Sequence, residues 1–158
     1  MKVLLISANR LQEPYPVYPV GLDYVAAAID RSHTVKTIDL NTLAGDGELV
    51  ELLKTFAPAV TGISLRNIDN TDTTDPRGFM GEYLDLIRII RRHCDTRLVL
   101  GGSGFTIFPK QILEFLDADF GIVGEGERLA ALLEALEKGQ APTGGEGACA
   151  ADPVNRHR

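Results

Sequence analysis

Short runs of valine, isoleucine and leucine alternate along the chain with longer stretches in which apolar residues recur every three or four positions. The short runs are near-continuous in apolar residues, which is typical of strands buried on both faces of a parallel sheet. They cover residues 3–6, 35–40, 59–65, 98–100 and 120–123. Each of these runs predicts a strand.

The stretches between the runs have the spacing i, i+3, i+4, i+7, which predicts helices with one apolar face. The residues at these positions are Leu22, Val25, Ala26 and Ile29; Leu49, Leu52, Leu53 and Phe56; Tyr83, Leu86, Ile87 and Ile90; and Leu129, Leu132, Leu133 and Leu136. A shorter helix is expected over residues 109–116, with Pro109 in its first turn and Thr106 as a candidate cap.

Alternating strands and helices predict an α/β fold, in which helices cover both faces of a parallel sheet. We expect a flavodoxin-like (Rossmann-like), doubly wound, five-stranded sheet in a three-layer arrangement. The open strand order 2-1-3-4-5 suits this chain better than a closed eight-stranded barrel, which needs far more residues.

The pattern changes near residue 138, because residues 139–158 are rich in glycine and proline and have almost no apolar periodicity. We therefore expect one domain over residues 1–138 and a linker or disordered tail over residues 139–158. A linker with nothing after it further suggests that a longer protein was cut here, or lost its second half.

Charge and composition exclude several classes of function. The formal net charge is −6 and no basic stripe is visible, which argues against nucleic-acid binding. The basic residues within 88–93 are interpreted as the solvated face of one helix. The apolar run at the N-terminus is too short for a secretory or membrane segment, so we expect a cytoplasmic protein without a membrane partner. Cys94 and Cys149 lack metal-ligand spacing and are expected to be reduced thiols.

Ligands of open parallel sheets bind beyond the carboxyl ends of the strands, and the loops expected at that edge are unusual here. Residues 8–19 form a long first loop that prolines stiffen, and residues 66–78 form a long polar loop after the third strand. Residues 101–106 read Gly-Gly-Ser-Gly-Phe-Thr, and residues 124–127 read Gly-Glu-Gly-Glu. Each loop alone fits a plain connection. Together they predict a wide, mostly neutral platform for a large flat ligand with a phosphate-bearing tail.

Residues 2–9, 14–22, 100–106 and 120–127 resemble the N-terminal cobalamin (vitamin B12)-binding domain of cobalamin-dependent radical S-adenosylmethionine (radical SAM) enzymes. The resemblance spans about residues 2–137. It implies that the corrin ring lies over the strand edge, flanked by the proline-rich loop, with its nucleotide tail beside the sheet. Full-length relatives continue into a barrel with a C-x-x-x-C-x-x-C motif, which would be the partner domain in the parent protein. Such enzymes commonly methylate or rearrange unactivated carbon centres.

The resemblance assigns cofactor contacts to residues in each of these loops, but no catalytic residue and no protein ligand to a metal. The residues expected to bind cobalamin are Asn9, Tyr15, Pro16, Tyr18, Pro19, Ser64, Arg66, Asn67, Asn70, Gly101, Gly102, Ser103, Phe105, Gly124 and Glu125.

Two departures from related proteins limit the chemistry. No cysteine triplet is present, so the iron–sulfur cluster and S-adenosylmethionine are expected only in a missing C-terminal domain. No D-x-H-x-x-G motif is present either, and His33, His93 and His157 are expected at the surface. We therefore expect cobalamin to bind without a protein histidine on cobalt. The lower side would be open to water or to a weak ligand from the loop around Asn67 and Asn70.

Other functions of the same fold require residues that this chain lacks. A receiver domain needs an acidic pair after the first strand, and a dinucleotide enzyme needs G-x-G-x-x-G at the same place. Ser103 fits a nucleophile elbow only in part, because Phe105 replaces the final glycine. The alternative that stays open is a flavodoxin-like structural or interaction module that has lost cofactor binding.

Overall fold

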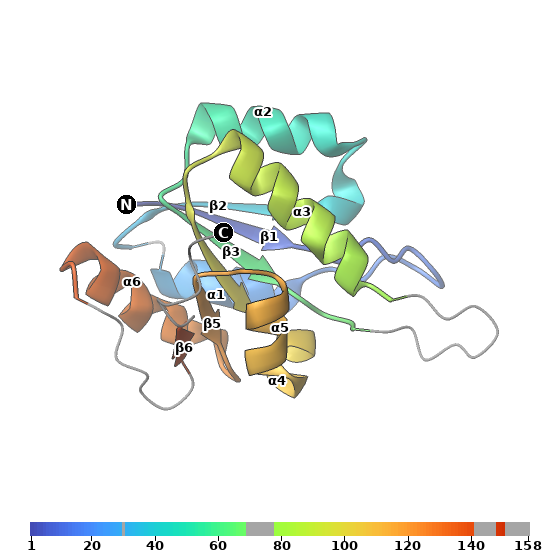
Figure 1. The fold of residues 1–158 in the computed structure, drawn as a ribbon. Helices are drawn as coiled ribbons and strands as arrows, with labels where there is room; N and C mark the ends of the chain where they lie inside the picture. The colour runs from blue at the N-terminus through green and yellow to red at the C-terminus, as the bar shows by residue number, and fades with distance from the viewer. Residues whose placement is uncertain (30, 69–77, 141–147, 151–158) are drawn as a thin grey trace.

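The computed structural model describes residues 1–29, 31–68, 78–140 and 148–150. Its sheet contains the five expected parallel strands, which are β1 (Lys2–Ser7), β2 (Thr34–Asp39), β3 (Val60–Ser64), β4 (Arg97–Gly101) and β5 (Phe120–Ile122) (Figure 1). They follow the order β2-β1-β3-β4-β5, which confirms the flavodoxin-like architecture.

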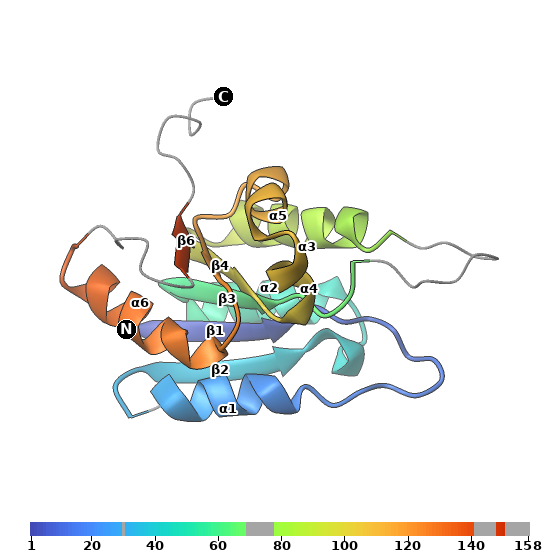
Figure 2. The same cartoon turned by 90° about the horizontal axis from the view of Figure 1, so that it is seen from below.

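Helices cover both faces of the sheet, as the alternation of elements predicts (Figure 2). One face carries α1 (Val20–Ile29) and α6 (Leu129–Glu137), and the other carries α2 (Asp46–Phe56), α3 (Met80–His93) and α5 (Pro109–Phe115). Two short 3₁₀ turns, η1 (Leu40–Thr42) and η2 (Gly126–Arg128), complete the connections.

The sheet divides the apolar core in two, because successive strand residues point to opposite faces. In β1, Leu4 and Ile6 pack with α2, α3 and α5, whereas Val3 and Leu5 pack with α1 and α6. Near-continuous apolar runs therefore bury both faces of the central strands. This is the physical reason that the runs predicted the strands so closely.

Two short elements were not expected from the sequence. Strand β6 (Ala148–Ala150) pairs antiparallel with β5 and lies within the segment expected to be a linker or tail. Helix α4 (Ser103–Ile107) follows β4 directly and contains Thr106. The expectation that Thr106 caps the next helix is therefore wrong, since Phe108 occupies that position. Instead the Thr106 hydroxyl donates to the Gly102 carbonyl at 3.1 Å and accepts from the Gly124 amide at 3.2 Å.

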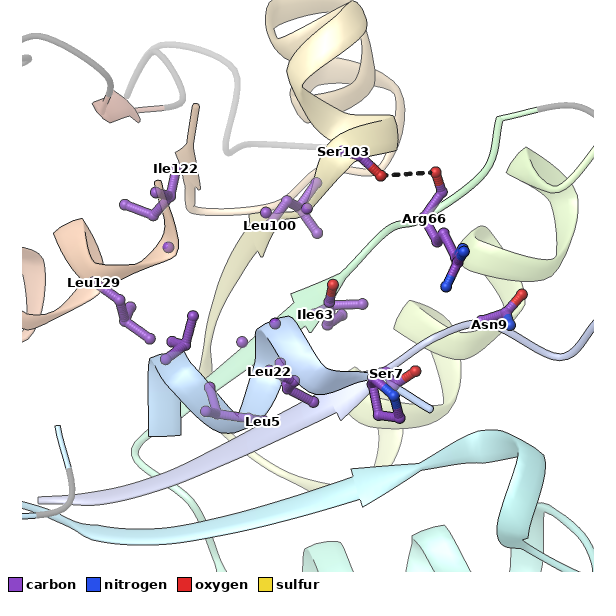
Figure 3. A pocket seen from close by; sticks show the side chains of 18 of the residues that line it. Leu5, Ser7, Asn9, Leu22, Ile63, Arg66, Leu100, Ser103, Ile122 and Leu129 are labelled. Carbon is purple, nitrogen blue, oxygen red and sulfur yellow. Dashed lines mark hydrogen bonds between the residues drawn. The ribbon is translucent and has the colours of Figure 1, made fainter. Parts of the chain in front are cut away.

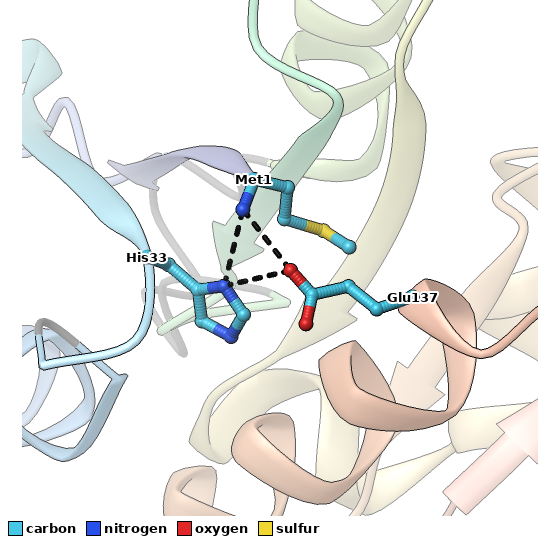
Figure 4. A network of polar contacts seen from close by, with 3 residues as sticks. All are labelled: Met1, His33 and Glu137. Atoms are coloured by element: carbon cyan, nitrogen blue, oxygen red, sulfur yellow. Dashed lines mark hydrogen bonds and ion pairs between the residues drawn. The ribbon is translucent and has the colours of Figure 1, made fainter.

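The position of His33 also differs from the expectation of a surface histidine. Its side chain is only 4% exposed, and its Nδ1 lies 3.4 Å from Glu137 Oε1 at the end of α6 (Figure 4). The α-amino group of Met1 donates to the same carboxylate oxygen at 3.1 Å. The end of α6 thus covers the turn between α1 and β2. His93 is half-buried at the end of α3, and His157 lies outside the described residues.

Within the part of the chain that the structure describes, no helix combines the length and the hydropathy that a membrane crossing needs.

Candidate functional site

A cleft of about 390 Å³ lies on the α1 and α6 side of the sheet and opens at the carboxyl edge of the strands (Figure 3). Its volume is in the range of small-molecule and cofactor sites, which is roughly 300–1,000 Å³. The ends of β1, β3 and β4 form its floor, α1 forms one wall, and η2 with the start of α6 forms the other.

The depth of the cleft depends on a glycine in the middle of β3. Gly62 faces α1 and α6, and a Cβ atom there would lie 2.8 Å from Leu5 Cδ2. Because Gly62 has no side chain, the space above it stays open between the apolar side chains of Leu22, Val25 and Leu129. The deep end of the cleft is therefore apolar.

The mouth of the cleft is polar. Ser7, Asn9, Ser64, Arg66 and Ser103 line it at the carboxyl ends of the strands. The Asn9 side chain accepts from the Leu11 amide at 3.3 Å, which turns the chain into the first loop. The Ser103 hydroxyl donates to the Arg66 carbonyl at 3.2 Å, and this contact joins the loops after β3 and β4 (Figure 3).

Gly102 lets the loops after β3 and β4 pack directly on each other. Its φ is +93°, and a Cβ atom there would lie 2.5 Å from the Leu65 carbonyl oxygen. The Gly104 amide donates to that same oxygen at 2.9 Å. Only glycine fits this backbone conformation and this close contact. The backbone at Gly101 and Gly102 is thereby held at the mouth of the cleft.

The proline-rich loop is tied down near both ends. Arg10 pairs with Asp46 at the start of α2 at 2.6 Å. At the other end, the Tyr18 hydroxyl donates to Asp23 Oδ2 in the first turn of α1, also at 2.6 Å. The hydrogen bond to Asp23 and the negative charge of its carboxylate raise the pKa of Tyr18. Tyr18 and Pro19 line the cleft, whereas Tyr15 is exposed on the outer part of the loop.

The structure brings many of the residues that were expected to bind cofactor into this one cleft. Those that line it are Asn9, Tyr18, Pro19, Ser64, Arg66, Gly101, Gly102, Ser103 and Gly124. Tyr15, Pro16, Asn67 and Glu125 do not line it. Asn70 lies outside the described residues.

Phe105 has a different position from the one expected, because its side chain is 0% exposed and belongs to the core between the sheet and α5. Its ring lies against Gly121 of β5, where a Cβ atom would be 2.2 Å from Phe105 Cζ. Asn67 contributes its carbonyl to the Tyr83 hydroxyl of α3, at 2.7 Å. Both residues hold loops of the carboxyl edge in place without lining the cleft.

Sequence reasoning missed the apolar walls of the cleft. Leu5, Leu22, Val25, Val99 and Leu129 have the same spacing as core residues, so nothing in the sequence separates the two roles. Gly62 offered the one available signal, since a glycine inside a buried strand often marks a close approach of another group.

The cleft has an unusual balance of charge. Of the side chains that line it in the described ranges, Arg66 is the one ionised group, and no histidine, cysteine or carboxylate is among them. No group of three or more potential metal-ligating side chains was found in the part of the chain that is described. The site therefore suits a ligand with an apolar, flat part and an anionic part, and it has no acid–base pair for catalysis.

Comparison with known proteins agrees with this geometry. Residues 7–134 match the model of the B12-binding domain family. Tryptophan 2-C-methyltransferase of Streptomyces laurentii is 28% identical over 142 residues, which are 87% of this chain and 23% of that enzyme. The chain spans about a quarter of the length of the curated relatives that it matches.

Solved structures give the same result. The radical S-adenosylmethionine methyltransferase TsrM from Kitasatospora setae, with cobalamin and a [4Fe-4S] cluster bound, has a TM-score of 0.86 and 29% identity over 97% of this chain and 27% of its own. The cobalamin-dependent enzyme OxsB, with aqua-cobalamin bound, has a TM-score of 0.74 over 97% of this chain and 21% of its own. At 19% identity, OxsB shows the fold alone. The resemblance seen in the sequence motifs is thereby confirmed, and this chain belongs to the B12-binding domain family.

Proposed function

We propose that this chain binds cobalamin in the cleft and across the sheet edge above it, as the cofactor domain of a cobalamin-dependent radical S-adenosylmethionine methyltransferase. The observation that carries the proposal is the open cleft above Gly62, at the carboxyl edge of a B12-binding-family fold. When bound, cobalamin would supply a cobalt centre that carries a methyl group between a donor and an acceptor.

The cleft fits the two chemically different parts of the cofactor. Its apolar deep end, between Leu22 and Leu129, would take the flat base of the nucleotide tail. Its polar mouth would hold the phosphate, where Ser64 and Ser103 offer hydroxyl donors and the Arg66 guanidinium offers a positive charge. The corrin ring would then lie over the strand edge, flanked by Tyr18.

The side chains of the cleft support binding without a protein histidine on cobalt. None of the lining residues in the described ranges is a histidine, and a guanidinium such as that of Arg66 has no lone pair to donate. His33 is buried at the opposite end of the sheet, against Glu137. We therefore propose that the lower face of cobalt meets water or a weak ligand from the loop after β3.

Paramagnetic resonance of the chain loaded with cob(II)alamin tests this coordination. We expect the spectra of the wild type and of the His33→Ala, His93→Ala and His157→Ala variants to agree. Nitrogen superhyperfine splitting that disappears in one of the variants would reject binding without a histidine.

Cofactor binding itself is tested by mixing the purified chain with hydroxocobalamin and separating the mixture by gel filtration. We expect red colour to travel with the protein and the absorption spectrum to change on titration. The rival function, a structural module that has lost its cofactor, predicts colourless protein and an unchanged spectrum. The open cleft argues against that rival, because a fold that no longer binds a ligand has no need for an empty space beside Gly62.

The parent protein would provide the remaining chemistry through a radical SAM barrel. The chain has two cysteines, too few for a C-x-x-x-C-x-x-C motif, so the cluster and S-adenosylmethionine would bind elsewhere. The names of both curated relatives describe methyl transfer, which supports a methyltransferase rather than a rearrangement enzyme.

A further inference from the structure

The ring of Tyr18 is held over the cleft by a single hydrogen bond. Tyr18 lines the cleft although its side chain is 68% exposed, so little packing restrains it. Its hydroxyl donates to Asp23 Oδ2 at 2.6 Å. A short hydrogen bond to a carboxylate is roughly twice as strong as one between neutral groups. This contact is therefore the main restraint on the direction of the ring.

The acceptor of this bond is a rigid element, and the donor is a loop. Asp23 lies in the first turn of α1, and the Leu22 amide that precedes it donates to the Pro19 carbonyl at 2.8 Å. The helix packs on the sheet through Leu22 and Ile29, which are buried. The position of the carboxylate is thus set by the core of the fold, and it transmits that position to the Tyr18 ring.

We propose that Asp23 is a positioning residue for cofactor binding, which holds the Tyr18 ring in the direction that bound cobalamin contacts. This inference rests on the proposed function. Asp23 does not line the cleft, so it acts through Tyr18 and not by touching the ligand. The ordering of the loop is then completed before the ligand arrives, which favours binding because less freedom is lost on association.

A purely structural role for Asp23 makes a different prediction. An acidic residue in the first turn of a helix favours the helix through the partial positive charge of its N-terminus. That role depends on the charge of Asp23, whereas the positioning role depends on an oxygen that accepts from Tyr18. Asp23→Asn removes the charge and keeps an acceptor, and Asp23→Ala removes both. The two variants therefore separate the two roles.

The experiment is a double-mutant cycle, with the dissociation constant of hydroxocobalamin measured by absorption titration of the full chain. We expect Asp23→Ala and Tyr18→Phe each to weaken binding by about two- to tenfold, the range of one hydrogen bond. The double variant should be no weaker than either single one, and Asp23→Asn should bind like the wild type. Tyr24→Phe is the matched control, because Tyr24 is an exposed tyrosine of α1 that does not line the cleft.

Three results would overturn the inference. They are wild-type affinity in Asp23→Ala, losses in the single variants that add in the double variant, and equal losses in Asp23→Ala and Asp23→Asn. Thermal unfolding of each variant checks that the fold is retained. If the wild type itself binds no hydroxocobalamin, the proposed function fails and this inference fails with it; if the wild type binds and the cycle shows no coupling, this inference alone fails.

Discussion

Two adjacent glycines at the end of β4 differ in what a side chain would meet. At Gly102 the backbone has a φ of +93°, and a Cβ atom would lie 2.5 Å from the Leu65 carbonyl. At Gly101 the nearest atom would be the Ile122 carbonyl oxygen at 3.8 Å, an ordinary contact. We expect Gly102→Ala to destabilise the fold by about 2–3 kcal/mol and Gly101→Ala by less than about 1 kcal/mol. Urea unfolding measures both, and equal losses would contradict the role given to Gly102.

Gly62 allows a test that separates cofactor binding from stability. A side chain here would meet the flexible end of Leu5 at 2.8 Å, which can move at small cost. Valine also favours strands over glycine, by up to about 1 kcal/mol. We therefore expect Gly62→Val to fold and yet to lose at least about tenfold in affinity for hydroxocobalamin, because its methyl groups fill the cleft.

The control for Gly62→Val is Gly81→Ala on α3, where a Cβ atom has no neighbour within 4 Å. That variant should bind like the wild type. Unchanged binding in Gly62→Val would show that the ligand does not use the deep end of the cleft.

Single residues of the site were predictable only where their chemistry is distinctive. The glycine pair Gly101 and Gly102, and the polar Ser64 and Ser103, follow strands and attracted notice for that reason. Phe105 follows the same glycines, but the sequence cannot tell which side of a helix as short as α4 faces the core. The apolar wall residues look like any other core residues, because a cleft and a core need the same side chains.

At the scale of elements, α4 is fastened to the sheet by one aromatic side chain. The Phe105 ring is fully buried and fits against Gly121, which has no side chain of its own. Phe105→Ala should therefore cost about 3–5 kcal/mol of unfolding free energy. Phe115→Ala is the matched control, since that ring is exposed on α5, and it should cost less than about 0.5 kcal/mol.

Cofactor binding gives a second measurement on the Phe105 variants. If Phe105 acts only in packing, the folded fraction of Phe105→Leu should bind hydroxocobalamin like the wild type. A folded Phe105→Leu variant with lost binding would return Phe105 to the site, as the sequence first indicated.

The long elements followed from periodicity, whereas the short ones did not. Each of the five parallel strands and the longer helices carries a run or repeat of apolar residues that its environment requires. Strand β6 has the sequence Ala-Cys-Ala and adds to the sheet by backbone pairing with β5, which needs no particular side chains. Helix α4 is a single turn between glycines, too short to show a period.

At the scale of the whole molecule, the position of the cleft follows from the order of the strands. The chain lays β2 on one side of β1 and β3 on the other, so the order reverses between β1 and β3. Loops that leave these two strands depart to opposite faces, and the crevice between them is where ligands of open α/β sheets bind. Ser7 at the end of β1 and Ser64 at the end of β3 pair in register, and both line the cleft. The location of the site was therefore predictable from the fold, although its depth was not.

The stability of the whole fold should depend on pH through Tyr83. Its side chain is 2% exposed, and its hydroxyl donates to the Asn67 carbonyl at 2.7 Å. Burial raises the pKa of Tyr83 above the ordinary value of 10.0, and the nearby charge of Glu82 raises it further. The folded state thus holds this proton more tightly than the unfolded state. The resulting stability is fully present below pH 10, where both states are protonated, and is lost as pH rises through the folded pKa.

Tyr83→Phe removes both the hydrogen bond and the titration. We expect the wild type to be more stable than this variant by about 1 kcal/mol at pH 7–9. Above pH 10 that advantage should fall by up to about 1.4 kcal/mol per pH unit until the folded pKa is reached. Urea unfolding of both proteins between pH 8 and 11 measures the difference. The pKa of Cys94 is also raised by burial, but both proteins carry it, so its effect cancels. A difference that does not change with pH would mean that Tyr83 ionises as easily in the folded chain as in the unfolded one, and that its hydroxyl does not fasten the loop after β3 to α3.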